Sequence, residues 1–172
     1  LPLKAGYKPA LFKLRRSWMA VAVLFIIALS VFLDRITKLW AVNNLLEVGD
    51  IPVINNVFHL TYAENTGAAF SILRGKQTFF IIVTVIGLIA ILWFYIKKPI
   101  NHPMLSIALA FIAGGGIGNL IDRIKYGYVV DFLYIKIIRF PIFNLADIFV
   151  TTGSILLIWY VLFIYKDNLK SE

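Results

Sequence analysis

An unbroken apolar run constrains the fold of this 172-residue chain more than any other feature. The segment from Thr78 to Ile96 contains no charged side chain. As a helix it would be roughly 28 Å long, which is enough to cross the hydrocarbon core of a bilayer. Three further segments, 18–42, 103–124 and 148–165, are also long and apolar enough to cross. The sequence therefore predicts four transmembrane helices.

The composition favours the same class of protein. Hydrophobic residues make up 60% of the chain, charged residues 15%, and the mean hydropathy is +0.85. These values are typical of an integral membrane protein, so we expect residues 1–172 to form a single membrane domain. The absence of cysteine excludes disulfides, thiolate metal sites and Cys nucleophiles. A cleavable signal peptide is the main competing interpretation of the basic start and first apolar run, but no small-residue cleavage site ends that run.

The distribution of basic residues predicts the orientation in the membrane. The net charge is +8, but Lys and Arg flank the apolar segments instead of forming one basic face, so we expect no nucleic-acid partner. Segments 1–17, 97–102 and 166–172 carry 9 Lys or Arg in 30 residues, whereas 43–77 and 125–146 carry 5 in 57. The positive-inside rule then predicts that both termini are cytoplasmic.

The two extracytoplasmic loops, 43–77 and 125–147, contain strand-like patterns. Residues Val57 to Tyr62 alternate and are rich in β-branched and aromatic side chains, which predicts a strand at the membrane surface. Alternation from Val129 through Lys136 permits a short hairpin in the second loop. On the third apolar segment, Gly114 and Gly118 lie four residues apart, a spacing that lets a neighbouring helix pack closely.

Ionisable residues lie close to these loops, where they are costly enough to indicate a functional site. Asp34 and Lys38 are spaced to form an ion pair across one helical turn. The neighbouring Asp122 and Arg123 permit a second charge pair at the end of the third segment. The simpler interpretation of both pairs is structural, because such pairs anchor helix ends at the interface.

The remaining chemistry is that of carboxylates. The two histidines, His59 and His102, are predicted on opposite sides of the membrane, so neither a Ser-His-Asp triad nor an HExxH zinc site can form. Two Asp side chains brought together cannot both ionise cheaply, so one keeps a proton while the other activates a water. That arrangement hydrolyses an amide without a metal. By spacing alone, any two of four acids can form the pair: Asp34, Asp122, Asp131 and Asp147.

Five short motifs make the chain resemble the lipoprotein signal peptidases, also called signal peptidase II, which are aspartyl peptidases of the bacterial cytoplasmic or inner membrane. The resemblance runs from about Asp34 to Thr152. One departure is Arg35, where the family usually has Gln. The motifs are Asp34-Arg35-Ile36-Thr37-Lys38, Asn65-Thr66-Gly67-Ala68-Ala69-Phe70, Gly118-Asn119-Leu120-Ile121-Asp122-Arg123, Val129-Val130-Asp131-Phe132 and Phe143-Asn144-Leu145-Ala146-Asp147.

The resemblance implies an all-α integral membrane protein with four transmembrane helices, a small extracytoplasmic β-cradle and a loop over the active site. It assigns the catalytic dyad to Asp131 and Asp147, facing the extracytoplasmic side. It also implies supporting roles, including substrate positioning, for Asn65, Asn119, Arg123, Asn144, Gly115, Asp34 and Lys38.

The activity implied by the resemblance is removal of the signal peptide from prolipoproteins whose Cys already carries diacylglycerol. A water activated between the two Asp would attack the carbonyl before the lipidated Cys, and the neutral Asp would protonate the leaving nitrogen. The expected partners are these precursors and membrane lipid. We expect a monomer that uses no metal or other cofactor.

Two other classes of function compete with this interpretation. A proton-coupled transporter also places Asp near membrane depth, but it usually shows inverted repeats and helices interrupted near the midplane. A Ser/Lys membrane peptidase needs a Ser with a Lys nearby on the outer side, and Ser71 with Lys76 is the pair that the sequence offers.

Overall fold

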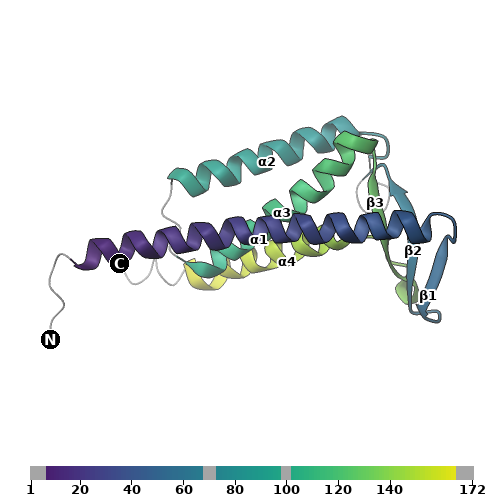
Figure 1. Cartoon of the computed structure of the whole chain (residues 1–172), viewed down its shortest axis with the longest axis horizontal. Helices are drawn as coiled ribbons and strands as arrows, with labels where there is room; N and C mark the ends of the chain where they lie inside the picture. Colours follow the sequence, from purple (N-terminus) through teal and green to yellow (C-terminus); the bar gives the residue numbers. More distant parts are fainter. Residues whose placement is uncertain (1–6, 68–72, 98–101, 166–172) are drawn as a thin grey trace.

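A computed structural model describes residues 7–67, 73–97 and 102–165, with side chains from residue 17 onward (Figure 1). Four helices make up most of the fold: α1 (Tyr7–Leu45), α2 (Gln77–Lys97), α3 (Pro103–Tyr126) and α4 (Leu145–Trp159), which the π-helical segment η3 (Tyr160–Tyr165) continues. The other elements are the strands β1 (Asp50–Ile54), β2 (Phe58–Asn65) and β3 (Val129–Ile135) and the short 3-10 helix η2 (Lys136–Ile138).

The helices run along one direction, and the sheet lies across one end of them (Figure 1). In the part of the chain that the structure describes, four helical segments are long and apolar enough to cross a membrane: 17–45, 77–97, 103–126 and 145–165. The prediction of four such helices with a small sheet is confirmed. The first residues of α1 and the last residues of η3 lie at the end away from the sheet, which we call the terminal end (Figure 1).

Local sequence signals explain where α3 and α4 begin and end. Pro103 occupies the first turn of α3, where a missing N–H costs nothing. Gly127 follows α3 with φ of 77°, a left-handed conformation that favours glycine, and its N–H donates to the carbonyl of Arg123. Asn144 caps α4: its side chain accepts from the N–H of Asp147, whose carboxylate accepts from the N–H of Asn144.

The three strands form an antiparallel sheet in the order β1-β2-β3. The strand predicted from Val57 to Tyr62 is present as β2, whereas β1 was not predicted. The hairpin predicted in the second loop is present only as a single antiparallel bridge: β3 pairs with β2, and after η2 the chain returns so that Phe143 pairs with Leu133 of β3. In this register Ala63 lies opposite Asp131, and Asn65 lies opposite Val129.

Close packing around α3 fixes the bundle. A Cβ atom on Gly114 would lie 2.7 Å from Cβ of Ser30 on α1, and one on Gly118 would lie 2.5 Å from Oδ2 of Asp34. The predicted close approach of a neighbouring helix at these two glycines is therefore confirmed. At the sheet end, a small apolar core joins α1 to β3 through Ala41, Leu45, Val130 and Phe132.

Candidate active site

The structure brings four acids together at the sheet end of the bundle. Each comes from a different element: Asp34 from α1, Asp122 from α3, Asp131 from β3 and Asp147 from α4. Three of them are almost fully buried, with exposed fractions of 0% for Asp34 and Asp122 and 1% for Asp131. The four acids form two pairs with different partners.

The first pair, Asp34 and Asp122, is held by cations. Nζ of Lys38 lies 2.9 Å from Oδ2 of Asp34 and 2.9 Å from Oδ2 of Asp122. Arg35 donates to the other oxygen of Asp122. The predicted pairing of Asp34 with Lys38 is confirmed, and Asp122 pairs with Arg35 and Lys38 rather than with its neighbour Arg123.

The cation-held pair also ties the helices to the rest of the site. Oδ1 of Asp34 accepts from the N–H of Ala146 at 3.0 Å, which joins α1 to the first turn of α4. Oδ2 of Asp122 accepts from the N–H of Val130 at 3.3 Å, which joins α3 to β3. Both acids therefore connect elements that carry the second pair.

The second pair, Asp131 and Asp147, is held by amides. Asp131 accepts from Nδ2 of Asn65 at 2.9 Å and from Nδ2 of Asn144 at 2.6 Å. Asp147 accepts from Nδ2 of Asn119 at 2.8 Å and from the N–H of Asn144 at 3.2 Å. Asn144 thus contacts both carboxylates, one through its side chain and the other through its backbone.

A chain of polar contacts links the two pairs. Nζ of Lys38 donates to Oδ1 of Asn119 at 2.9 Å. The same oxygen accepts from Nδ2 of Asn144 at 3.1 Å. Because both acceptor contacts fix the carbonyl side of Asn119, its NH₂ group is oriented toward Asp147.

The electrostatic surroundings of Asp131 favour a proton on this residue. Burial, and then the negative charge of Asp147, raise the pKa of Asp131 to about 7. The amide donors Asn65 and Asn144 act in the opposite direction, because they stabilise the carboxylate. Near neutral pH the pair can therefore hold one proton, which is the arrangement required to activate a water beside a neutral acid.

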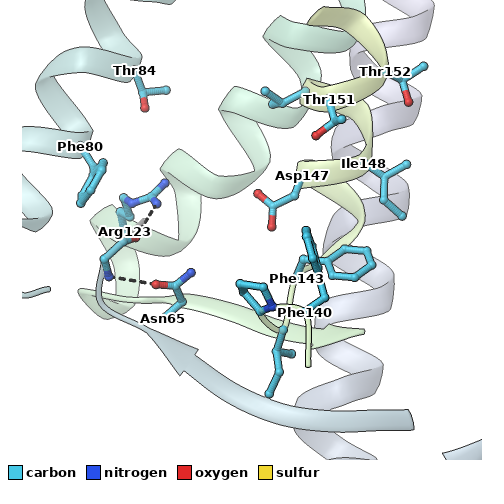
Figure 2. A pocket seen from close by; sticks show the side chains of 14 residues that line it. Asn65, Phe80, Thr84, Arg123, Phe140, Phe143, Asp147, Ile148, Thr151 and Thr152 are labelled. Carbon is cyan, nitrogen blue, oxygen red and sulfur yellow. Dashed lines mark hydrogen bonds between the residues drawn. The ribbon is translucent and has the colours of Figure 1, made fainter. Parts of the chain in front are cut away.

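A cavity of about 590 Å³ lies against this pair, and Asp147 faces it (Figure 2). Arg123 reaches toward the same space from α3. Among the described residues that line the cavity, the ionisable side chains are Asp147 and Arg123. Asp131 is not part of the lining, which agrees with its burial. The lining residues are Asn65, Gly67, Phe80, Thr84, Arg123, Phe140, Pro141, Ile142, Phe143, Asp147, Ile148, Val150, Thr151 and Thr152.

Arg123 forms part of the cavity wall near the end of β2 and holds the neighbouring residues of that wall in place. Its NH2 atom donates to the carbonyl of Gly67 at 3.5 Å, and its guanidinium carbon lies 5.1 Å from the ring centre of Phe80 on α2. Gly67 in turn donates its N–H to Oδ1 of Asn65 at 2.9 Å (Figure 2). This orients the NH₂ group of Asn65 toward Asp131.

Gly115 has a packing role near the site and does not line the cavity. A Cβ atom at Gly115 would lie 2.3 Å from the carbonyl oxygen of Ala146. Only glycine therefore lets the first turn of α4, which carries Asp147, pack this closely against α3.

The predicted site residues all gather at this end of the bundle. The sequence did not indicate the aromatic part of the cavity wall. Phe140 and Phe143 come from the segment between η2 and α4, with ring centres 5.7 Å apart. The predicted loop over the site is described only in part, because residues 68–72 lie outside the described structure. Ser71 of the alternative Ser/Lys pair lies in that same segment.

A metal site finds no support among the side chains described. Within residues 17–67, 73–97 and 102–165, no group of three His, Asp or Glu side chains is arranged to hold a metal ion.

Comparison with known proteins supports a membrane peptidase. A family model described as Signal peptidase (SPase) II matches residues 26–163. The chain belongs to this family. It is therefore a bacterial multi-pass membrane protein and a peptidase of the aspartic type.

Individual members of the signal peptidase II family match over most of their length. A lipoprotein signal peptidase of Clostridioides difficile (strain 630) is 44% identical over 140 residues, which are 81% of this chain and 94% of the relative. One from Caldanaerobacter subterraneus subsp. tengcongensis is 48% identical over 139 residues, covering 80% and 94%. A bacterial membrane enzyme solved by the in meso method at 2.3 Å resolution is 36% identical, with a TM-score of 0.77 over 88% of this chain and 92% of that one.

Proposed function

We propose that this chain removes the signal peptide from diacylglyceryl-modified prolipoproteins, cleaving before the lipidated Cys with Asp131 and Asp147 as the catalytic dyad. The observation that carries the proposal is the shared contact with Asn144, whose side chain and backbone hold the two carboxylates side by side. The family membership supplies the class of substrate.

The proposed reaction needs one proton on the dyad. The carboxylate of Asp147, which faces the cavity, takes a proton from a bound water as that water attacks the scissile carbonyl. The one proton that the dyad holds goes to the leaving nitrogen, so the C–N bond breaks as the new C–O bond is retained. The dyad ends the cycle with one proton, now on Asp147, and no metal or covalent intermediate takes part.

The cavity fits a substrate with an apolar body and one polar scissile bond. Its walls come from α2, α3 and α4 and from the aromatic segment between η2 and α4. We assign the part of this cavity that α4 lines to the signal peptide and the part that Phe140 and Phe143 line to the lipidated side chain. Asn65 and Arg123 position the substrate backbone or the polar part of its lipid, because they lie at the rim of the cavity.

The other polar residues position the dyad rather than the substrate. Asn119 and Asn144 hold the two carboxylates, while Asp34 and Lys38 fix Asn119 and the first turn of α4. Gly115 permits the close contact with Ala146. These residues contact no substrate in this proposal and act by holding the two carboxylates and the first turn of α4 in place.

The positive-inside rule supports an active site on the outer side of the cytoplasmic membrane. The basic terminal end then lies in the cytoplasm, and the sheet end faces outward, where lipidated precursors are presented. The dyad is built from α4 and β3 of the same chain. We therefore propose that a monomer embedded in membrane lipid is active.

A cleavage assay with purified protein tests the proposal. Wild-type protein should cut a precursor that carries diacylglycerol on its Cys and leave the unlipidated precursor uncut, and EDTA should not reduce the rate. Asp147→Asn should abolish this cleavage. Glu47→Gln is its matched control and should cleave as the wild type does, because Glu47 is an exposed acid at the same end of the bundle. Equal cleavage of both precursors would contradict the proposed substrate, and loss of activity in EDTA that zinc restores would contradict the dyad.

A further inference from the structure

A second cavity lies on the flank of α1, away from the catalytic cavity. It has a volume of about 90 Å³, and we call it the Arg35 cavity. It shares no lining residue with the 590 Å³ cavity. Its lining residues come from α1, from the end of α3 and from the start of β3: Arg35, Lys38, Leu39, Val42, Tyr126, Tyr128 and Val130.

The polar lining of the Arg35 cavity suits an anion. Among the described residues, the lining contains two cations and two phenols and no acid. Lys38 is fully buried and paired with Asp34 and Asp122, so the N–H groups left for an anion are those of Arg35. The side chain of Arg35 is 20% exposed, whereas that of Asp122 is fully buried. Among the described residues, Arg35 uses one guanidinium nitrogen for Asp122.

The shape of the guanidinium group narrows the class of anion. Its further N–H groups form a planar fork, which binds phosphate and carboxylate oxygens with two hydrogen bonds. The cavity is too small for an acyl chain together with a head group, so it takes a compact group. A phosphate has the oxygens that the guanidinium group binds, and it is small enough for the cavity. The rest of the molecule that carries it would lie outside.

The surroundings indicate where the rest of that molecule would lie. Leu39, which lines the cavity, is 49% exposed, and Ile36 and Trp40 beside it on α1 are 48% and 42% exposed. These side chains lie on the flank of a helix that crosses the membrane, so they face acyl chains. The stacked rings of Tyr126 and Tyr128, with centres 5.9 Å apart, lie at the sheet end, where aromatic residues meet lipid head groups.

We propose that the Arg35 cavity binds the phosphate of a membrane phospholipid whose acyl chains lie along the exposed flank of α1. Arg35 supplies the hydrogen bonds, and the tyrosines close the cavity on the side of the sheet. This is a binding site distinct from the proposed catalytic cavity. Basic pockets between membrane helices bind phospholipid head groups through the same chemistry.

Mass spectrometry of the intact protein released from detergent tests the site, because it resolves a bound lipid by its mass. Titration with dioleoyl phosphatidylglycerol should show a first bound lipid at low concentration. Dioleoylglycerol, which has the same chains but no phosphate, should bind at least about tenfold more weakly, as expected when charged hydrogen bonds are lost. Equal binding of the two lipids would overturn the proposal.

Two variants separate the phosphate contact from general lipid binding. Arg35→Gln should weaken the first phosphatidylglycerol by about tenfold. Leu39→Trp should do the same by filling the cavity while leaving the ion pairs of Arg35 and Lys38 intact, so it serves even if Arg35→Gln fails to fold. Ile89→Trp is the control for general lipid binding, since Ile89 is an exposed apolar side chain on α2 and lines neither cavity.

Wild-type binding in Leu39→Trp, or an equal loss in Ile89→Trp, would contradict the site. Displacement of phosphatidylglycerol by millimolar inorganic phosphate would show that the cavity takes free phosphate and would overturn the lipid assignment. Asp147→Asn should bind phosphatidylglycerol as the wild type does, so failure of the proposed catalytic function leaves this test unaffected.

Discussion

Two pairs of buried acids lie at the same end of the bundle, and they differ in what compensates their charge. Asp34 and Asp122 share Lys38, whose Nζ lies 2.9 Å from an oxygen of each. Among the described side chains, no cation forms an ion pair with Asp131 or Asp147; Lys38 and Arg123 act on them only at longer range, and both acids accept from the amides of asparagines. A buried charge needs a counter-charge or a proton, and an amide supplies neither. We infer that the cation-held pair supports the structure and that the amide-held pair carries out the chemistry.

The largest expected effect concerns the amide-held pair. Asp147→Asn should lower the rate of cleavage of a lipidated precursor by about 10⁴-fold or more, the loss typical of removing one member of a catalytic unit. Its thermal unfolding in detergent should stay close to that of the wild type, because an amide replaces a carboxylate of the same shape. A large loss of stability with residual cleavage would mean that Asp147 belongs with the structural acids.

Variants of the cation-held pair should lose more stability than variants of the amide-held pair do. Lys38→Met leaves two carboxylates without their shared cation and should destabilise the fold by about 3–5 kcal/mol. Lys125→Met is the control, because Lys125 is an exposed cation over the ring of Tyr126 and should matter by less than about 1 kcal/mol. Unfolding curves in detergent compare the two variants. Equal melting of both would show that Lys38 is not needed to compensate the buried acids.

A packing variant tests how tightly the cation-held pair is enclosed. A Cβ atom at Gly118 would lie 2.5 Å from Oδ2 of Asp34, so Gly118→Ala should cost about 1–3 kcal/mol. At Gly116, two residues earlier on α3, the nearest atom would be at an ordinary 3.7 Å, so Gly116→Ala should melt as the wild type does. If both variants unfolded alike, α1 and α3 would not be packed as closely as described.

The smallest effect sharpens the role of the amides. The pKa of Asp131 is raised to about 7, so the rate should fall as the pH rises through this value and the dyad loses its last proton. Asn65 donates to Asp131 and favours its charged form. Asn65→Ala should therefore move this basic limb of the pH–rate profile to higher pH, by about one unit or less. A shift to lower pH would contradict the assigned contact.

The local features of this arrangement could be predicted from the sequence. The apolar runs indicated four helices, and the spacing of Asp34 and Lys38 indicated their ion pair, because both depend on neighbouring residues. Asn144 and Asp147 also stand at the spacing of a capping box, which is a local signal for the start of α4.

The long-range features could not be predicted from spacing. Asp122 finds its partner Arg35 at a distance of 87 residues in sequence, which only the packing of α3 on α1 determines. The strand β3 pairs with β2 across the whole of α2 and α3, and a local alternating pattern cannot distinguish this from a hairpin. The choice of Asp131 and Asp147 among four acids came from the family resemblance.

A comparison of Asp131→Asn, Asp147→Asn and the double variant tests the central claim most directly. If the two carboxylates share one proton and one water, removing either leaves the other without its partner. Cleavage of a lipidated precursor should then fall to the same floor in all three variants, with melting temperatures close to the wild type. Partial activity in each single variant, with losses that multiply in the double variant, would show that the two acids act separately and would contradict the dyad.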